Sequence, residues 1–251
     1  MSARGVARRP LVALVPSYDR PALLARTLEG LRDVVRPDDI RVLAQPKGHP
    51  LGSGEARRRL CAEAVAAHGP DCVLLSLDDD ATFVPGEANV AWAADLFDDP
   101  RVGIVQLTNR RGPTRDHQTE HPYLYHVYLL RGALVAEGLT YEPDEYADEL
   151  TLSLRAWLAG WTLLRTQRAR VLHHVTPRGR VGPQGGGREG AFAEGHVPVR
   201  STFLARFRDT GLVTCQEGTR AGVALPTPYA SVRVTPLARR RHQEAARART
   251  W

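Results

Sequence analysis

Short apolar runs of strand length alternate with segments of helical periodicity in the first third of the chain. The apolar runs are Leu11–Val15, Ile40–Ala44 and Cys72–Leu77. Between them, residues 21–31 repeat leucines at helical spacing, and residues 54–69 have the length and the terminal glycine of a second helix. Strands that alternate with helices on this period predict an α/β fold, with a mostly parallel sheet between two layers of helices.

The alternation becomes less regular in the second half of the chain. An apolar stripe from Leu150 to Trp161 predicts the clearest helix of the sequence. Four further segments are expected to be strands: residues 102–107, 123–130, 162–166 and 170–175.

Proline, glycine and arginine mark the expected boundaries and loops. Pro16 is expected to end the first strand, and Pro21 suits the first turn of the helix that follows. Residues 176–190 hold six glycines and two prolines and are expected to form a mobile loop. Residues 239–249 carry five arginines against one glutamate, so this tail is expected to be loosely held, or helical only on contact.

The composition describes one globular domain of ordinary size. The chain has 251 residues, of which 43% are hydrophobic and 25% charged, so it has enough apolar residues for a core. Its longest uncharged stretch, residues 221–232, is shorter than the ~20 apolar residues that a membrane span needs. The first apolar run is also too short for a signal peptide. The three cysteines show no paired metal spacing, and together these features favour a cytoplasmic protein.

The net charge is +6, which favours an anionic partner such as a nucleotide, a nucleic acid or an acidic membrane face. Lys47 is the single lysine among the 34 basic residues. Such an excess of arginine is typical of a GC-rich coding bias, so the charge does not choose among these partners.

Three consecutive aspartates, Asp78, Asp79 and Asp80, follow the third apolar run directly. Three carboxylates at the end of a buried strand repel one another unless a positive group is near. Open α/β sheets bind ligands at this edge, and Mg²⁺ takes a few carboxylate oxygens while leaving room for phosphate oxygens. The segment therefore indicates a metal–nucleotide site, and a solvated turn or helix cap is the alternative.

Two acidic residues, Asp148 and Glu149, stand at the start of the predicted helix in the second half. The positive end of the helix dipole stabilises acids there. A carboxylate held near a bound electrophile can take a proton from an attacking hydroxyl. The pair is therefore a candidate general base, and simple helix-start charges are the alternative.

Two adjacent histidines, His173 and His174, close the last apolar run. Neighbouring residues on a strand point to opposite faces, so at most one of these imidazoles can face the site. A structural histidine is the alternative. The glycine-rich segment 179–190 matches neither a Walker loop nor a dinucleotide fingerprint, and is interpreted as a flexible lid whose arginines touch phosphate.

Taken in order, four segments resemble the GT-A class of nucleotide-sugar-dependent glycosyltransferases, most closely glycosyltransferase family two. Residues 11–31, "LVALVPSYDRPALLARTLEGL", resemble the opening strand, turn and helix, and residues 73–86, "VLLSLDDDATFVPG", resemble the metal-binding DXD segment. Residues 148–164 are similar to the acceptor-half helix with its acidic pair, and residues 169–174 fall where the family often carries a histidine. The resemblance covers roughly two-thirds of the chain.

The resemblance implies donor-binding roles for residues in the first half. Pro16, Ser17 and Tyr18 would line the nucleobase pocket, Arg57 would sit near the nucleotide, and Asp78 would approach the ribose or the donor sugar. Two features depart from the family: residues 44–54 replace the usual Asp-Gly-Ser stretch, and Arg58 stands where Asn is usual.

The resemblance also implies a divalent metal, Mn²⁺ or Mg²⁺, and a general base. Asp80 would hold the metal, with Asp79 as an alternative, and His173 or His174 would complete the metal or diphosphate site. Glu149 falls at the position of the family's catalytic carboxylate, where Asp is commoner, and Asp148 is its acidic neighbour. The implied domains are a GT-A domain over residues 1–210, with a nucleotide-sugar half at about 11–100 and an acceptor half at about 101–210, and a basic extension over 211–251.

The activity implied is an inverting transfer of sugar from a nucleoside-diphosphate sugar to an acceptor hydroxyl. Arginines expected outside the core suit an anionic acceptor, the most natural being a hydroxymethylated pyrimidine base in viral-type DNA. These arginines are Arg57–Arg59, Arg110, Arg111, those flanking the glycine-rich segment and those of the tail. The alternatives are a small natural product or cell-surface glycan as acceptor, a sugar-phosphate nucleotidyltransferase, and a non-enzymatic nucleic-acid-binding protein.

Overall fold

The computed structural model describes residues 9–46, 48, 51–83, 88–108, 118–122, 124, 127–142, 148–173, 207, 209–214 and 233–251. The strands are β1 (Leu11–Tyr18), β2 (Ile40–Gln45), β3 (Val73–Ser76), β4 (Ala81–Phe83), β5 (Val102–Thr108), β6 (Gln118–Glu120), β7 (Tyr128–Arg131), β8 (Thr162–His173), β9 (Val213–Thr214) and β10 (Arg233–Val234). The helices are α1 (Pro21–Leu31), α2 (Ser53–His68), α3 (Val90–Asp95), α4 (Gly132–Ala136), α5 (Asp148–Leu158) and α9 (Pro236–Ala248), with short 3₁₀ turns at Pro37–Asp39 and Leu96–Asp98.

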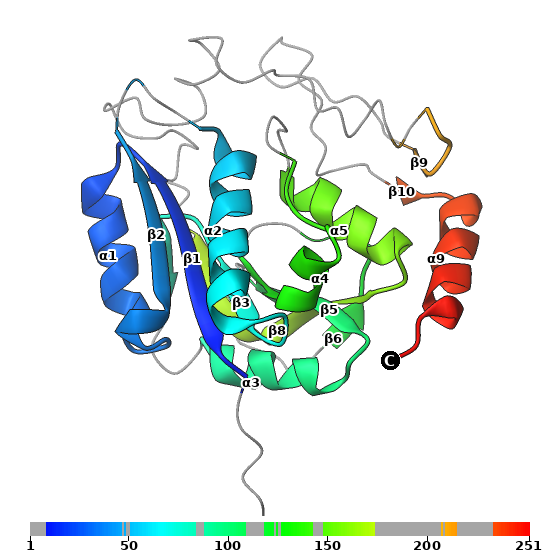
Figure 1. Ribbon diagram of the computed structural model, residues 1–251, viewed down its shortest axis with the longest axis horizontal. Helices are drawn as coiled ribbons and strands as arrows, with labels where there is room; N and C mark the ends of the chain where they lie inside the picture. Colours follow the sequence, from blue (N-terminus) through cyan, green and yellow to red (C-terminus); the bar gives the residue numbers. More distant parts are fainter. Residues whose placement is uncertain are drawn as a thin grey trace, which may run out of the picture.

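A central eight-stranded sheet organises the molecule (Figure 1). Its strand order is β2-β1-β3-β7-β5-β8-β4, and β6 pairs with β8 beside this path. β1 is parallel to β2 and β3, and β5 is parallel to β8, whereas β7, β4 and β6 pair antiparallel to their neighbours. The result confirms the α/β fold with a mostly parallel sheet that the sequence predicts.

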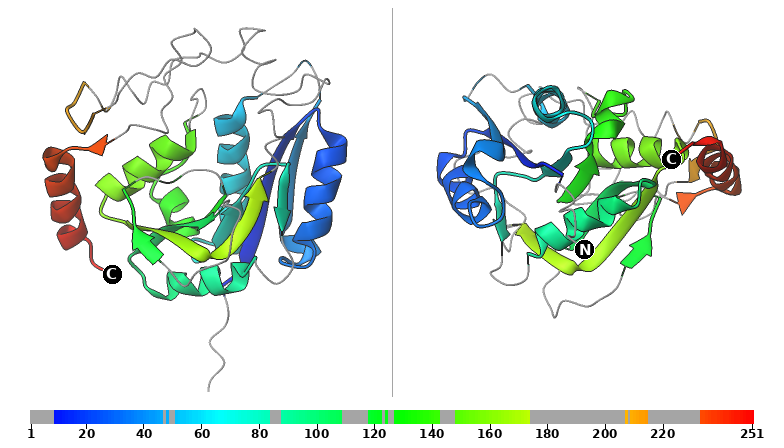
Figure 2. Two further views of the ribbon diagram at one scale, coloured as in Figure 1. Left: turned by 180° about the vertical axis from the view of Figure 1, so that it is seen from behind. Right: turned by 60° about the horizontal axis from the view of Figure 1, so that its bottom comes forward.

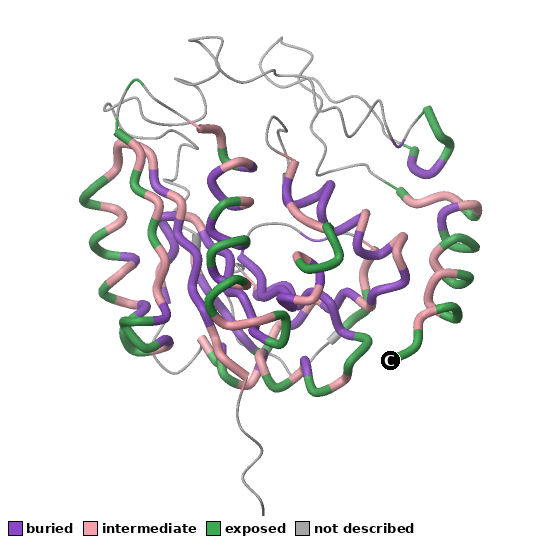
Figure 3. Tube along the Cα trace, viewed as in Figure 1, coloured by how far each residue is buried: buried purple, intermediate pink, exposed green. Residues whose placement is uncertain are grey.

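Helices cover both faces of the sheet (Figure 2), because β1 is apolar on both sides. Val12 and Leu14 belong to one core, which Leu60 of α2 shares. The residues that alternate with them, such as Ala13, belong to a second core together with Leu31 of α1. Buried positions therefore follow the strands and the inward faces of the helices (Figure 3). Among the described residues, no helix is long and apolar enough to cross a membrane.

The first strand does not end at Pro16 as expected, but continues to Tyr18. The pairing of β1 with β3 ends at Leu14, and beyond that point β1 pairs with β2 alone. The backbone of Leu14 faces β3, since its carbonyl accepts from Leu77 N, so by alternation the nitrogen of Pro16 also faces that side. A missing N–H is tolerated there because no partner strand remains.

Two strands of the second half differ from the expected boundaries. β7 begins at Tyr128 rather than at residue 123. Residues 162–173 form one long strand, β8, where two separate strands were expected. β8 stays continuous because it pairs with different neighbours along its length, β5 and β6 over its first part and β4 at its end.

The basic tail is a helix docked on α5, so it is not loosely held, and it agrees with the other expectation, a helix in contact with the rest of the protein. Thr235 caps α9, and α9 lies beside α5 (Figure 1). The imidazole of His242 stacks on the indole of Trp157, with 4.3 Å between ring centroids, and its Nδ1 lies 2.7 Å from the Trp157 carbonyl oxygen. The Arg249 guanidinium covers the ring of Trp161 at 4.0 Å. These aromatic contacts hold the tail, and neighbouring arginines point to solvent.

Candidate active site

The carboxyl ends of β1 and β3 and the first turns of α2 and α5 meet at one edge of the sheet (Figure 1). This edge collects most of the residues singled out from the sequence. Ser17 lies at the end of β1, the three aspartates follow β3, and Arg57 and Glu149 lie in the first turns of α2 and α5.

The middle aspartate, Asp79, is fully buried and held by β1 and the turn after it. Ser17 Oγ donates to Asp79 Oδ2 at 2.6 Å, and Arg20 Nε donates to the same oxygen at 3.1 Å. A second nitrogen of Arg20 pairs with Oδ1. Burial raises the pKa of Asp79 to about 6, against the opposing effects of Arg20 and Ser17. This environment favours a structural role for Asp79.

The outer aspartates, Asp78 and Asp80, keep part of their carboxylates accessible, and Asp80 Oδ2 lies 3.5 Å from Arg20 Nη1. The backbone of the segment is fixed by Thr27 of α1, whose hydroxyl lies 2.8 Å from the carbonyl oxygens of both Asp79 and Ala81. Asp79 is thus turned fully inward, whereas Asp78 and Asp80 keep 23% and 10% of their side-chain surface exposed.

Arg57 is buried, with 1% of its surface exposed, although the sequence suggested a position near the nucleotide and outside the core. Its Nη2 donates to Asp78 Oδ1 at 2.5 Å, and its Nη1 donates to Ser53 Oγ at 2.5 Å. The same Nη1 lies 3.4 Å from Glu149 Oε1. The guanidinium is buried because two carboxylates compensate its charge.

Glu149 is also buried, at 3% exposure, in the first turn of α5. One carboxylate oxygen faces Arg57, and the other, Oε2, has no hydrogen-bond partner among the described residues. A buried carboxylate oxygen left open in this way can accept a proton or a hydrogen bond from a bound molecule. The side chain of Asp148 lies outside the described part of the structure.

A chain of buried hydroxyls, which sequence reasoning missed, lies next to this pair. Tyr128 and Tyr141 hydroxyl oxygens are 2.5 Å apart, and Tyr141 donates to Ser76 Oγ at 2.9 Å. Burial raises the pKa of both tyrosines well above the ordinary value, so both stay neutral. The Arg57 guanidinium lies over the Tyr141 ring at 5.8 Å. Ser76, a polar residue inside an apolar strand, was the available signal.

The remaining candidates border the same edge. Pro16 and Tyr18 are half-buried at the end of β1, and the Tyr18 hydroxyl accepts from the backbone N–H of Gly48 at 3.1 Å. His173 is the Cα partner of Ala81 in the β4–β8 ladder, so the backbone at the end of β8 lies next to the aspartates. The side chain of His173 and the whole of His174 lie outside the described residues, as does the glycine-rich segment.

The oxygen ligands at this edge suit a hard divalent metal that a bound diphosphate also coordinates. In the described ranges, no three histidine, cysteine or acidic side chains are arranged so that they could hold a metal ion on their own. Mg²⁺-type sites commonly use only one or two carboxylates and take their other oxygens from phosphate and water. The carboxylates of Asp78 and Asp80 fit that pattern, and Asp80 is held more loosely by its arginine, at 3.5 Å from Arg20 against 2.5 Å between Asp78 and Arg57.

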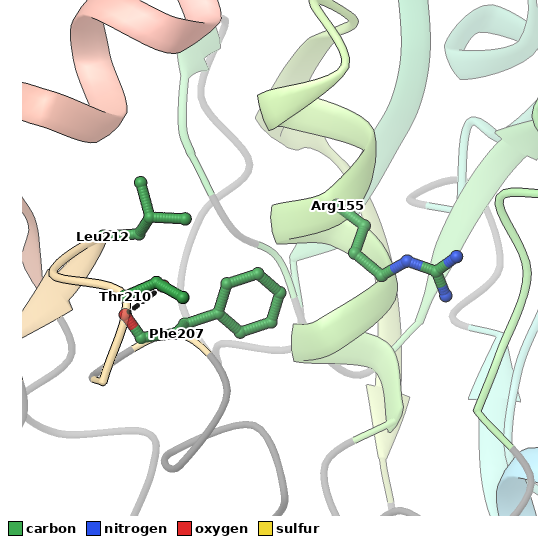
Figure 4. A pocket seen from close by; sticks show the side chains of 4 residues that line it. All are labelled: Arg155, Phe207, Thr210 and Leu212. Carbon is green, nitrogen blue, oxygen red and sulfur yellow. Dashed lines mark hydrogen bonds between the residues drawn. The ribbon is translucent and has the colours of Figure 1, made fainter.

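A separate cavity of about 270 Å³ lies beside α5 (Figure 4). Arg155, Phe207, Thr210 and Leu212 line it. The Arg155 guanidinium points away from Phe207 and is held by Glu142 at 2.6 Å. Since none of the described residues that line it is acidic, a histidine or a cysteine, the candidate chemistry remains at the edge of the sheet.

The comparisons with known proteins identify the fold of the chain. No protein-family model matches the sequence, and no curated protein matches it. Among solved structures, a mannosyltransferase from Pyrobaculum calidifontis in complex with GDP-Man and Mn²⁺ is similar, with a TM-score of 0.53 and 17% identity over 98% of this chain and 77% of that one. GalNAc-T7, solved with UDP, GalNAc and Mn²⁺, gives a TM-score of 0.50 and 14% identity over 65% of this chain. This chain spans 44% of the GalNAc-T7 chain. The chain therefore has the GT-A fold.

Proposed function

We propose that the protein is a metal-dependent glycosyltransferase that moves a sugar from a nucleoside-diphosphate sugar to an acceptor hydroxyl. The observation that carries the proposal is the position of Glu149, a buried carboxylate with one open oxygen, which shares Arg57 with Asp78 at the carboxyl edge of a GT-A sheet. The two solved neighbours, which contain a nucleotide or nucleotide sugar together with Mn²⁺, support this ligand class.

The donor would lie along the edge formed by β1 and the aspartate segment. Pro16, Ser17 and Tyr18 would contact the base, and Asp78 the ribose or donor sugar. Asp80 would hold the divalent metal, with His173 or His174 as a further ligand. A metal bound there supplies positive charge that neutralises the departing diphosphate.

Glu149 would act as the general base. Its open oxygen would take the proton of the acceptor hydroxyl as that hydroxyl attacks the anomeric carbon. The other carboxylates already have partners or proposed roles: Asp79 is buried against Ser17 and Arg20, Asp78 is bound to Arg57, and Asp80 is assigned to the metal. A single displacement with inversion is therefore the favoured route.

A donor-hydrolysis assay with Mn²⁺ tests the proposal. Purified protein incubated with a panel of nucleotide sugars should release nucleoside diphosphate, and the release should stop in EDTA. Release of pyrophosphate in a parallel incubation with a nucleoside triphosphate and a sugar 1-phosphate would instead identify a sugar-phosphate nucleotidyltransferase. Neither release nor donor-induced thermal stabilisation with any donor of the panel would contradict the proposal.

The acceptor proposed is anionic, and the specific candidate is a hydroxymethylated pyrimidine base in DNA. Support comes from the outer surface of α9, where four arginines are exposed: Arg239, Arg240, Arg241 and Arg247. Arg57 does not contribute because it is buried, and Arg58 and Arg59 pair with Glu55. Reaching a base hydroxyl would require partial unstacking of that base.

Salt dependence tests this acceptor separately from the activity. Phosphate contacts should make DNA affinity fall steeply between about 50 and 200 mM salt. A variant with glutamines at the four α9 arginines should flatten that slope without changing donor hydrolysis. If the protein shows no DNA affinity at low salt and transfers no sugar to hydroxymethylated DNA, the acceptor is a small molecule or a glycan.

A further inference from the structure

We propose that Arg57 is a positioning residue that orients both the base Glu149 and the donor-side carboxylate Asp78, and does not itself touch the substrate. The inference rests on the proposed function. Asp78 belongs to the nucleotide-sugar half and Glu149 to the acceptor half, and the Arg57 guanidinium contacts both carboxylates.

The burial of Arg57 separates this role from that of a ligand contact. With 1% of its surface exposed, the side chain does not reach an incoming diphosphate. Two carboxylates at one edge would repel each other without a cation between them. A guanidinium suits that position because its planar fork donates in two directions, whereas an ammonium is a single point charge.

Arg57 is itself held in place, which is what a positioning residue requires. It projects from the first turns of α2, and Ser53, four residues earlier on the same helix, accepts from its Nη1. The ring of Tyr141 lies beneath the guanidinium, and the Tyr141 hydroxyl is tied to Ser76 of β3. The guanidinium is thus fixed from α2 and from the sheet at once.

The contacts predict two separable consequences of losing Arg57. Through Glu149 Oε1, Arg57 sets which carboxylate oxygen remains open to the acceptor, so its loss should lower kcat for transfer. Through Asp78, it orients a donor contact, so its loss should also weaken donor binding. If Arg57 had only a structural role, its loss would lower the amount of folded protein, and the changes in kcat and in donor binding would not be separable.

Double-mutant cycles test the proposal. Arg57→Met, Glu149→Gln and the double variant are assayed for transfer kcat and for donor binding by titration. Arg57→Met alone should lower kcat by roughly 10²-fold or more, the worth of a positioned base. In the Glu149→Gln background it should lower kcat by less than about threefold, because groups that act as a unit are not additive. Donor binding should still weaken in that background, and a parallel cycle with Asp78→Asn should remove the weakening.

Arg58→Met is the matched control, since Arg58 is the next residue of α2 and pairs only locally with Glu55. It should leave kcat and donor binding as in the wild type. Additive losses in both cycles, or an Arg57→Met enzyme with unchanged kcat, would overturn the proposal. If Arg57→Met does not fold, two other proteins take its place in the cycles. One is the Arg57→Met/Glu149→Gln protein, which buries one fewer negative charge. The other is Arg57→Lys.

Arg57→Lys keeps the positive charge, but its ammonium is a single point charge that pairs with one carboxylate at a time. Compared with Arg57→Met, it should therefore restore either kcat or donor binding, but not both. Restoration of both, or of neither in a folded protein, would contradict the assignment. A wild-type protein without transferase or hydrolase activity would refute the proposed function itself. An active wild type with additive cycles would refute only the role of Arg57.

Discussion

The two oxygens of Glu149 have different surroundings: Oε1 lies 3.4 Å from Nη1 of Arg57, and Oε2 is buried without a hydrogen-bond partner in the described part of the chain. The ion pair with Arg57 fixes the carboxylate through Oε1 and leaves Oε2 for a substrate. Asp79 differs because both of its oxygens face a described partner: Oδ2 accepts from Ser17 and Arg20, and Oδ1, although it also lacks a hydrogen bond, is in an ion pair with Arg20.

Replacing Glu149 by glutamine should lower sugar transfer by roughly 10²–10⁴-fold, because the amide cannot take the acceptor proton. Donor and metal binding, followed by thermal shift, should stay close to the wild type. Asp148→Asn is the control at the adjacent position. If that variant is the inactive one and Glu149→Gln transfers normally, the base has been placed one residue too late.

Asp80 and Asp79 should respond in opposite ways to substitution. Asp80→Ala should abolish metal-dependent transfer with the melting temperature preserved, since its carboxylate is at the edge of the site. Asp79→Ala should destabilise the fold by roughly 2 kcal/mol, because it removes the buried acceptor of Ser17 and the partner of Arg20. Thermal unfolding and Mn²⁺ titration of both variants check the contrast, and unchanged turnover in Asp80→Ala would exclude it as the metal ligand.

The two described cysteines should be inert in the folded protein. Burial raises the pKa of the Cys61 thiol to about 12 and that of Cys72 to about 11. The sign matters here: a raised pKa disfavours the thiolate, so at pH 8 only about one Cys61 in 10⁴ would be reactive even if reached. Iodoacetamide at pH 8 should label neither residue before denaturant is added, as peptide mass spectrometry would show. Labelling of either thiol in the native protein would contradict the burial.

Gly160 should be intolerant of any side chain, because α9 passes directly over it. Its φ is +93°, and a Cβ there would lie 2.6 Å from Ala246 N. Gly160→Ala should therefore loosen α9, visible as faster proteolysis of the C-terminal helix, and cost more stability than the backbone strain of about 1 kcal/mol alone. Gly138→Ala is the matched control, since Gly138 also has positive φ, +77°, with nothing within 4 Å. Equal losses in the two variants would show that contact with α9 is not the cause.

The sequence predicts the elements of the first half well, because each strand there is a short apolar run, buried in β1 and β3 and half-exposed in β2, and the helices lie between these runs. The placement of Ser17, Asp78 and Asp80 at one edge follows from that wiring, because the carboxyl ends of parallel strands meet there. Glu149, on a helix of the second half, was expected at the same edge from the family resemblance.

The parts that could not be predicted depend on partners distant in sequence. Arg57 is charged and sits in an arginine-rich stretch, so only its pairing with Asp78 and Glu149 explains its burial. The tail is likewise polar by composition, and α9 docks through the stacking of His242 on Trp157. Neither partner can be recognised from local pattern, since each pair joins segments from different parts of the chain.

The early separation of β1 from β3, at Leu14, has a consequence for how this protein could be redesigned. Because the strand order is β2-β1-β3, β2 lies on one side of β1 and β3 on the other. The two helices that connect these strands, α1 and α2, pack on opposite faces of the sheet. The position of the donor edge at the end of β1 is therefore set by connectivity, and core substitutions will not move it. A library aimed at a new donor preference should vary the segments that follow β1 and β2 and leave the strands unchanged.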